Sequence, residues 1–361
     1  MAERINVTKT HLPELQEYQD MVAEIWKSGQ LTNYGKYCLE LESALKNRLG
    51  VKHLKLVSNG TIAIQLAIKA LDLKGEIITT PFSYVATVSS MVWEGCIPVF
   101  VDIDENDFCI DVEKIEAAIT SETTGILATH VYGKPCNVDR IKQIADKHNL
   151  KVIYDAAHAF DVELNGTSLL KHGDVSTLSF HATKVFHTGE GGAVITNDDD
   201  IAHKLAYMGN FGHNGKEDFY GVGVNAKISE LHSAMGLCVL PHMENIIEAR
   251  RNAVERYNAV LGKLNTLRIA EISPNVKHNY SYYPVVLKSE AVLLKIQSAL
   301  NEHNIYPRRY FYPSLNKLPY VPYARMPVAE SISERILCLP LSSDLSEDEI
   351  NLITSVISNN L

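Results

Sequence analysis

Long apolar runs, blocks of basic residues and paired cysteines are all missing from this sequence. No apolar stretch approaches the roughly 20 residues of a membrane-spanning helix, so we expect no membrane partner. The net charge is −9 and the lysines and arginines are scattered, so we expect no nucleic-acid partner. The six cysteines form neither CxxC pairs nor a metal-ligand spacing, and a reducing cytoplasm fits them best.

Strand and helix patterns alternate between about residues 50 and 200. The β-rich runs include 53–58, 76–81 and 124–133, and helical patterns such as 61–71 and 137–149 lie between them. Strands that alternate with helices favour an α/β fold in which a mostly parallel sheet lies between helices.

The pattern changes after about residue 230. Residues 228–264 read as one or two long helices, broken or bent near Pro241 because proline cannot complete the helical hydrogen-bond ladder. Tyrosine-rich and proline-rich segments follow. Since 361 residues exceed one minimal domain, we expect a large domain over residues 1–240 and a smaller C-terminal α/β domain over residues 241–361.

Polar residues follow each predicted strand of the large sheet. In such sheets the ligand lies beyond the carboxyl ends of the strands, so we expect these segments to line one rim. They are residues 58–61, 80–84, 130–133, 155–158 and 179–184.

The first of these segments, "SNGT" (58–61), stands between a strand and a helix. Gly60 leaves the first N–H groups of the helix open and Thr61 adds a hydroxyl, which suits a phosphate. A helix cap with a turn glycine is the alternative.

The segment "IYDAAH" (153–158) places Asp155 at the end of a strand. An ionised carboxylate there is suited to accept a hydrogen bond from a protonated ring nitrogen, and His158 is near enough to contact the same ligand. Capping of a helix is the alternative for Asp155.

Residues 179–192 read "SFHATKVFHTGEGG" and contain Lys184. A solvated surface charge, a phosphate clamp and an amine that forms a Schiff base are the three roles open to it. The glycines lack the GxGxxG spacing and precede a strand, which argues against dinucleotide binding. His181 and His187 have no third ligand in view, so we predict no metal site and assign neither histidine a role.

Taken together, these groups match the contacts that pyridoxal phosphate needs. The open helix start and Ser179 match its phosphate, and Tyr84 is placed to stack on its ring. Asp155 matches the pyridinium nitrogen, His158 the phenolic oxygen, and Lys184 the aldehyde carbon. Each motif is weak alone, but their conjunction in this order predicts a pyridoxal phosphate enzyme.

Nearly the whole chain resembles the DegT/DnrJ/EryC1/StrS family of sugar aminotransferases, within fold type I of the pyridoxal phosphate enzymes. The segments that carry the resemblance include "TTPFSYVATVSSMVWEGCIPVFVDID", "THVYGKP", "YDAAHAFD", "SFHATKVFHTGEGGAVITND" and "GVGVNAKISELHSAMG". The lysine loop is the most family-specific of them. The resemblance implies a large domain with a mostly parallel sheet between helices, plus a smaller C-terminal α/β domain.

The resemblance also implies roles for individual residues. Lys184 looks like the catalytic Schiff-base lysine and Asp155 like the pyridinium partner, while Tyr84 stands where the family has a stacking aromatic. Asn225 matches an asparagine that reaches the cofactor phosphate of a neighbouring subunit, which implies a homodimer with shared active sites. Lys227 stands where the family more often has arginine. The phosphate ligands that the resemblance implies are Gly60, Thr61 and Ser179.

The implied reaction moves an amino group from glutamate to a nucleotide-linked keto-deoxysugar. C4 of dTDP-4-keto-6-deoxyglucose is the favoured acceptor, and a C3 aminotransferase acting on a dTDP-3-keto-6-deoxyhexose is the alternative. Dehydratases of the family carry histidine where this chain has Lys184, so dehydration is less favoured. The products would serve deoxyamino sugar biosynthesis, for O-antigen or another polysaccharide.

Residues 306–312 are the expected acceptor contacts in the C-terminal part. Arg308 and Arg309 can pair with phosphate oxygens, and Tyr310 and Tyr312 are the neighbouring candidates. A solvated loop is the alternative.

Overall fold

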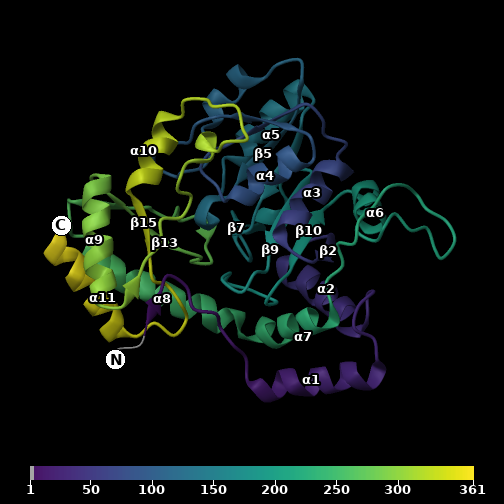
Figure 1. Cartoon of the computed structure of the whole chain (residues 1–361), viewed down its shortest axis with the longest axis horizontal. Coiled ribbons are helices and arrows are strands. Elements are labelled where there is room, and N and C mark those ends of the chain that lie inside the picture. Colours follow the sequence, from purple (N-terminus) through teal and green to yellow (C-terminus); the bar gives the residue numbers. More distant parts are fainter. Residues whose placement is uncertain (1–3) are drawn as a thin grey trace.

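A sheet of seven strands lies at the centre of residues 4–361, the part of the chain that the computed structural model describes (Figure 1). Within this sheet only β10 runs against the other strands, so the carboxyl ends of the remaining strands meet at one rim. The expected mostly parallel sheet is confirmed. In spatial order the strands are β2 (His53–Val57), β10 (Gly192–Thr196), β9 (Val175–Ser179), β6 (Lys151–Asp155), β5 (Thr123–Thr129), β3 (Glu76–Thr79) and β4 (Ile97–Phe100).

Helices cover both faces of this sheet because successive strand residues point to opposite sides. Leu127 and Ile153 pack in a core with α3 and α4, whereas their neighbours Ile126 and Val152 belong to the core that includes α2 and α5. No helix within residues 4–361 is both long and apolar enough to cross a membrane. The helices of this part are α1 (Leu15–Ser28), α2 (Lys36–Leu49), α3 (Gly60–Ala70), α4 (Val85–Trp93), α5 (Val138–His148), α6 (Asp199–Met208) and α7 (Glu230–Val239).

A smaller α/β unit follows, on the left of Figure 1. Its antiparallel sheet packs on helices through a separate core that includes Leu293, Ile353 and Leu337. The elements are β11 (Leu267–Ile269), β13 (Tyr283–Leu287), β15 (Ile336–Leu339), α8 (Met243–Leu261), α9 (Glu290–Glu302), α10 (Pro327–Arg335) and α11 (Glu347–Asn360).

The helix break expected near Pro241 is present as a 3₁₀ turn at Leu240–His242, between α7 and α8. Met243, at the start of α8, packs in the large core, while Tyr257, farther along the same helix, packs in the small one. The division of the chain at residue 240 therefore stays a prediction, because α8 contributes to both cores.

Two small sheets join segments that are distant in the sequence. β1 (Ile5–Asn6) pairs in parallel with β14 (Ile305–Tyr306), which brings the start of the chain to the C-terminal unit. The hairpin of β7 (Glu163–Leu164) and β8 (Thr167–Ser168) pairs with β12 (Val276–Lys277). Both sheets therefore join the C-terminal part of the chain to earlier segments.

Candidate functional site

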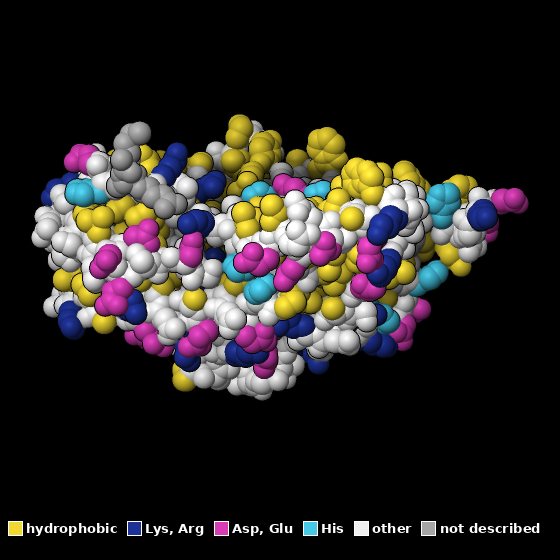
Figure 2. Space-filling view, turned by 90° about the horizontal axis from the view of Figure 1, so that it is seen from below, with side chains coloured by type: hydrophobic (Ala, Val, Ile, Leu, Met, Phe, Trp, Pro, Cys, Tyr) yellow, Lys and Arg dark blue, Asp and Glu magenta, His cyan; other side chains and the backbone are white. Residues whose placement is uncertain are grey.

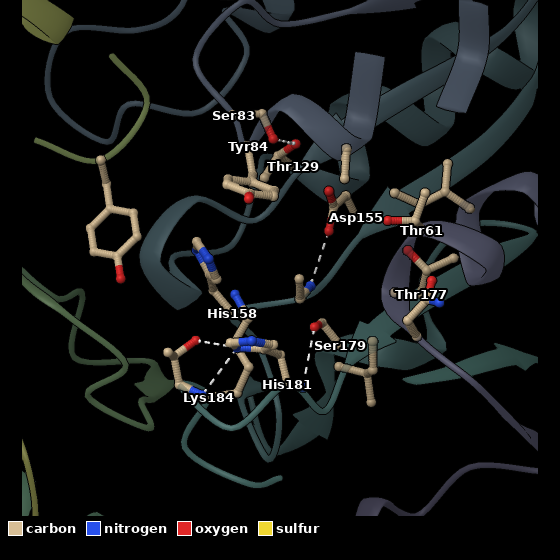
Figure 3. A pocket seen from close by; sticks show the side chains of 18 of the residues that line it. Thr61, Ser83, Tyr84, Thr129, Asp155, His158, Thr177, Ser179, His181 and Lys184 are labelled. Atoms are coloured by element: carbon tan, nitrogen blue, oxygen red, sulfur yellow. Dashed lines mark hydrogen bonds between the residues drawn. The ribbon is translucent and has the colours of Figure 1, made fainter. Parts of the chain in front are cut away.

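A cavity of about 230 Å³ lies at the carboxyl rim of the large sheet (Figure 3). Four of the five segments expected at the rim line it. The exception is 130–133, which lies behind His158; Thr129, the last residue of β5, supplies that part of the wall. Tyr282, Arg308 and Tyr310 close the cavity from the C-terminal unit.

One end of the cavity is the start of α3. The side chain of Asn59 accepts the N–H of Ile62 at 2.9 Å, so the cap that the sequence left as an alternative is present. The N–H groups of Gly60 and Thr61, at the first helical positions, have no intrahelical partner and face the rim. A Cβ on Gly60 would lie 2.9 Å from that of Ser179, so glycine is what allows β9 to approach this closely. The helix start is thus both capped and open to an anion.

Asp155 ends β6 and is 5% exposed. Its Oδ1 accepts the N–H of Ala157 at 3.1 Å, and its Oδ2 accepts the hydroxyl hydrogen of Thr87 at 2.6 Å. No α-helix begins directly after Asp155, so the helix-capping alternative is wrong. The carboxylate is fixed in place and faces the cavity (Figure 3).

Lys184 is only partly exposed and borders the same cavity. The pKa of its amine is lowered to about 8, chiefly by burial; the carboxylate of Asp155 opposes this shift, and the nearby guanidinium of Arg308 adds to it. Within residues 4–361 no carboxylate lies within ion-pair distance of the amine. A solvated, fully charged lysine is therefore the wrong description, and a substantial fraction of the amine is neutral near pH 8.

His158 is buried and neutral. Its Nδ1 accepts the N–H of Tyr132 at 3.3 Å, so its Nε2 carries the proton. Burial holds the pKa of His158 well below its usual value, and the Lys184 amine lowers it further. The ring lies parallel to that of Tyr132 and 4.7 Å from the centroid of Tyr282, and Phe311 stacks on it at 5.7 Å. These aromatic rings fix the orientation of the imidazole.

Tyr84 precedes α4 and lines the cavity with about half of its surface exposed. In the view of Figure 3 its ring lies above the cavity and Lys184 below it. A flat ligand between them would have an aromatic ring on one side and the amine on the other.

The residues expected to contact the acceptor divide into three groups. Arg308 and Tyr310 line the cavity, with the guanidinium 4.8 Å from the ring centroid of Tyr310. Tyr312 lies outside it, in an adjoining cleft of about 130 Å³ that Tyr84 and Arg308 also border. Arg309 borders the same cleft and pairs with Glu290 at 2.6 Å, so its contact with a phosphate stays a prediction.

Asn225 is exposed and does not line the cavity of its own subunit. It follows the segment 209–224, which projects beyond α6 (Figure 1). Nearby, the amine of Lys227 donates to Asn210 Oδ1 at 3.1 Å and lies over the ring of Phe211. Any contact between Asn225 and a cavity of this kind must therefore involve another subunit.

The structure gives His187 a role that the sequence did not indicate. Its buried Nε2 donates to the carbonyl of His11 at 2.7 Å, and the hydroxyl of Thr10 donates to the carbonyl of Ala182 at 2.9 Å. The N-terminal segment is thus fastened to the lysine loop. His181 stays at the exposed edge of the cavity, where its Nδ1 lies 2.8 Å from Oγ1 of Thr183.

Comparison with known proteins agrees with this geometry. Residues 14–358 match the DegT/DnrJ/EryC1/StrS aminotransferase family. The chain belongs to this family. It is 42% identical over 363 residues to a dTDP-4-amino-4,6-dideoxy-D-glucose transaminase of Shigella dysenteriae, covering 99% of both proteins. The family and the fold expected from the sequence are both confirmed.

Solved structures of the aminotransferase family share the whole fold. DesI, solved in the presence of its TDP-sugar product, superposes with a TM-score of 0.93 at 30% identity, over 99% of this chain and 93% of DesI. NtdA of Bacillus subtilis, solved with its cofactor PMP bound, gives a TM-score of 0.88 at 28% identity, over 96% of this chain and 82% of NtdA.

The pKa of Lys184 yields a test that needs no bound cofactor. The rate at which an amine-directed acylating reagent labels Lys184 should rise with pH around a midpoint near 8 instead of 10.5, because only the neutral amine reacts. In Asp155→Asn the midpoint should move lower, since the carboxylate stabilises the charged amine. Peptide mass spectrometry measures the labelling. A midpoint near 10.5 would show that the amine is solvated.

Proposed function

We propose that this protein is a pyridoxal phosphate-dependent aminotransferase that moves the amino group of glutamate to C4 of dTDP-4-keto-6-deoxyglucose. The observation that carries the proposal is the convergence of the Lys184 amine and the Asp155 carboxylate on one cavity beside an anion-suited helix start. The acceptor is inferred from the Shigella dysenteriae relative, whose name places the amine at C4.

The residues around the cavity fit this cofactor. Gly60, Thr61 and Ser179 would hold its phosphate, since a glycine-lined helix start and the Ser179 hydroxyl meet there. Asp155 would pair with the ring nitrogen, and Lys184 would hold the aldehyde carbon. The remaining two contacts would be Tyr84 on the ring face and His158, whose Nε2–H would donate to the phenolic oxygen.

The chemistry is divided between the cofactor and the chain. When bound, pyridoxal phosphate supplies a protonated ring that withdraws electrons from the substrate carbon and carries nitrogen between two substrates. Lys184 Nζ would take the proton from the substrate carbon as nitrogen leaves glutamate. It would give a proton to C4 of the acceptor as nitrogen is delivered there. Its pKa of about 8 suits both directions near neutral pH, because an amine close to half-protonation both accepts and donates readily. Asp155 would keep the ring nitrogen protonated throughout.

Arg308 and Tyr310 would contact the nucleotide sugar at the C-terminal side of the cavity. Guanidinium groups form strong, charge-assisted hydrogen bonds with phosphate oxygens, and Arg308 is exposed enough to reach a diphosphate. Tyr312 would meet a more distant part of the same acceptor, because its cleft and the main cavity share Arg308.

The proposal includes a homodimer with shared active sites. Asn225 is exposed on a projecting segment and is free to reach the cofactor phosphate of a second copy. The chain also exposes large apolar side chains, among them Leu15 and Trp26 on α1, that a second copy would cover. Figure 2, which views the molecule from below Figure 1, shows hydrophobic side chains in yellow among the charged ones on this face. The cytoplasmic location and the polysaccharide pathway stay predictions.

The identity of the product tests the reaction. The protein loaded with pyridoxal phosphate should transfer nitrogen from L-[¹⁵N]glutamate to dTDP-4-keto-6-deoxyglucose, with one 2-oxoglutarate formed per amino sugar. Proton and ¹⁵N NMR should place the label on C4, and Lys184→Ala should form no product.

Other products of that incubation would each contradict part of the proposal. Nitrogen on C3, with a 3-keto sugar as the better acceptor, would support the C3 alternative. Loss of a hydroxyl without net transfer of nitrogen would support dehydration. A wild-type protein that binds no pyridoxal phosphate would overturn the cofactor itself.

Mixing of inactive subunits tests the shared site. Lys184→Ala and Asn225→Ala should each be impaired alone. A refolded mixture should recover activity, because mixed dimers contain one site with both native residues. Equal activity before and after mixing would contradict the role of Asn225 across the interface, and a monomer in solution would contradict the dimer.

A further inference from the structure

Three buried hydroxyl groups connect Asp155 to the neighbouring strands. Thr87 Oγ1 lies 2.6 Å from Asp155 Oδ2, Ser83 Oγ lies 2.7 Å from Thr87 Oγ1, and Thr129 Oγ1 lies 2.9 Å from Ser83 Oγ. All three side chains are at most 4% exposed. They come from the segment after β3, from α4 and from β5, and Figure 3 shows Ser83 next to Thr129 at the wall of the cavity.

The direction of these hydrogen bonds follows from counting protons. An ionised carboxylate only accepts, and a hydroxyl has one proton to donate. Thr87 gives its proton to Asp155, so between Thr87 and Ser83 the donor must be Ser83. Ser83 has then used its own proton, so Thr129 donates to Ser83. The three groups form a one-way donor chain that ends on the carboxylate.

The same carboxylate receives a second donor. Its Oδ1 accepts the N–H of Ala157, so each oxygen of Asp155 is held by one hydrogen bond from the protein. Two donors of this kind, one on each oxygen, prevent rotation of the carboxylate. One side of the carboxylate stays open to the cavity, where Asp155 is a lining residue.

We propose that Thr87 is a positioning residue: at the end of the donor chain from Thr129 through Ser83, it holds the carboxylate of Asp155 turned toward the ring nitrogen of the cofactor. This inference rests on the proposed function, since it concerns the same carboxylate. Without the hydroxyl of Thr87, the carboxylate would be held less firmly against the ring nitrogen, and that nitrogen would be less fully protonated. The ring then withdraws electrons less strongly.

The test replaces the hydroxyl with a methyl group of the same shape. Wild type, Thr87→Val and Thr87→Ser are loaded with pyridoxal phosphate that carries ¹⁵N in the ring, and the ¹⁵N chemical shift reports whether that nitrogen is protonated. The valine variant should shift toward unprotonated pyridine and bind the cofactor about tenfold more weakly, the order expected for one lost bond to a charged group. The serine variant should restore the wild-type shift.

Two further variants keep the test decisive. Ser333→Ala removes a buried hydroxyl in α10, far from the cavity, and should leave both readouts unchanged. Ser83→Ala removes the hydroxyl that donates to Thr87 and should give a ¹⁵N shift between those of wild type and Thr87→Val. This variant tests the role of the donor chain even where Thr87→Val does not fold. A ¹⁵N shift that is unchanged in both Thr87→Val and Ser83→Ala would overturn the inference and leave the proposed function standing. A wild type that binds no cofactor would instead overturn the function.

Discussion

The parallel register of β5, β6 and β9 is the constraint on which the site depends. Thr129 and Thr177 are the partners of Asp155 in the neighbouring strands, so three side chains reach the rim at the same level. The reversed strand β10 returns the chain to this rim, and Gly192 lies opposite both the end of β2 and the end of β9. The open start of α3 and the lysine loop are adjacent for this reason.

Burial and neighbouring charges set the protonation of the Lys184 amine and the His158 imidazole at this rim. Burial lowers the pKa of the Lys184 amine to about 8, while Asp155 opposes this shift and the charge of Arg308 adds to it. His158 stays uncharged, with its proton on Nε2. The cavity thus combines a reactive amine, a fixed carboxylate and a neutral donor, a combination suited to proton transfer at a carbon atom.

Features encoded by local pattern could be predicted from the sequence. Gly60, Asp155 and Lys184 each follow a recognisable strand, and the parallel sheet brings strand ends together. Features that depend on packing between distant segments could not. Thr87 lies 68 residues from Asp155 in the sequence and shows no periodic signal. The hydrogen bond between His187 and the carbonyl of His11 also follows only from tertiary structure. The ion pair of Arg309 with Glu290 likewise joins two separate segments and has no local signal in the sequence.

Reductive trapping tests the central claim, that Lys184 is the amine which holds the cofactor. The wild-type protein loaded with pyridoxal phosphate is treated with sodium borohydride, digested and analysed by peptide mass spectrometry. The account predicts a phosphopyridoxyl group on the peptide that contains Lys184 and on no other peptide. A group on a different lysine, such as Lys227, or the absence of any stable adduct would contradict it.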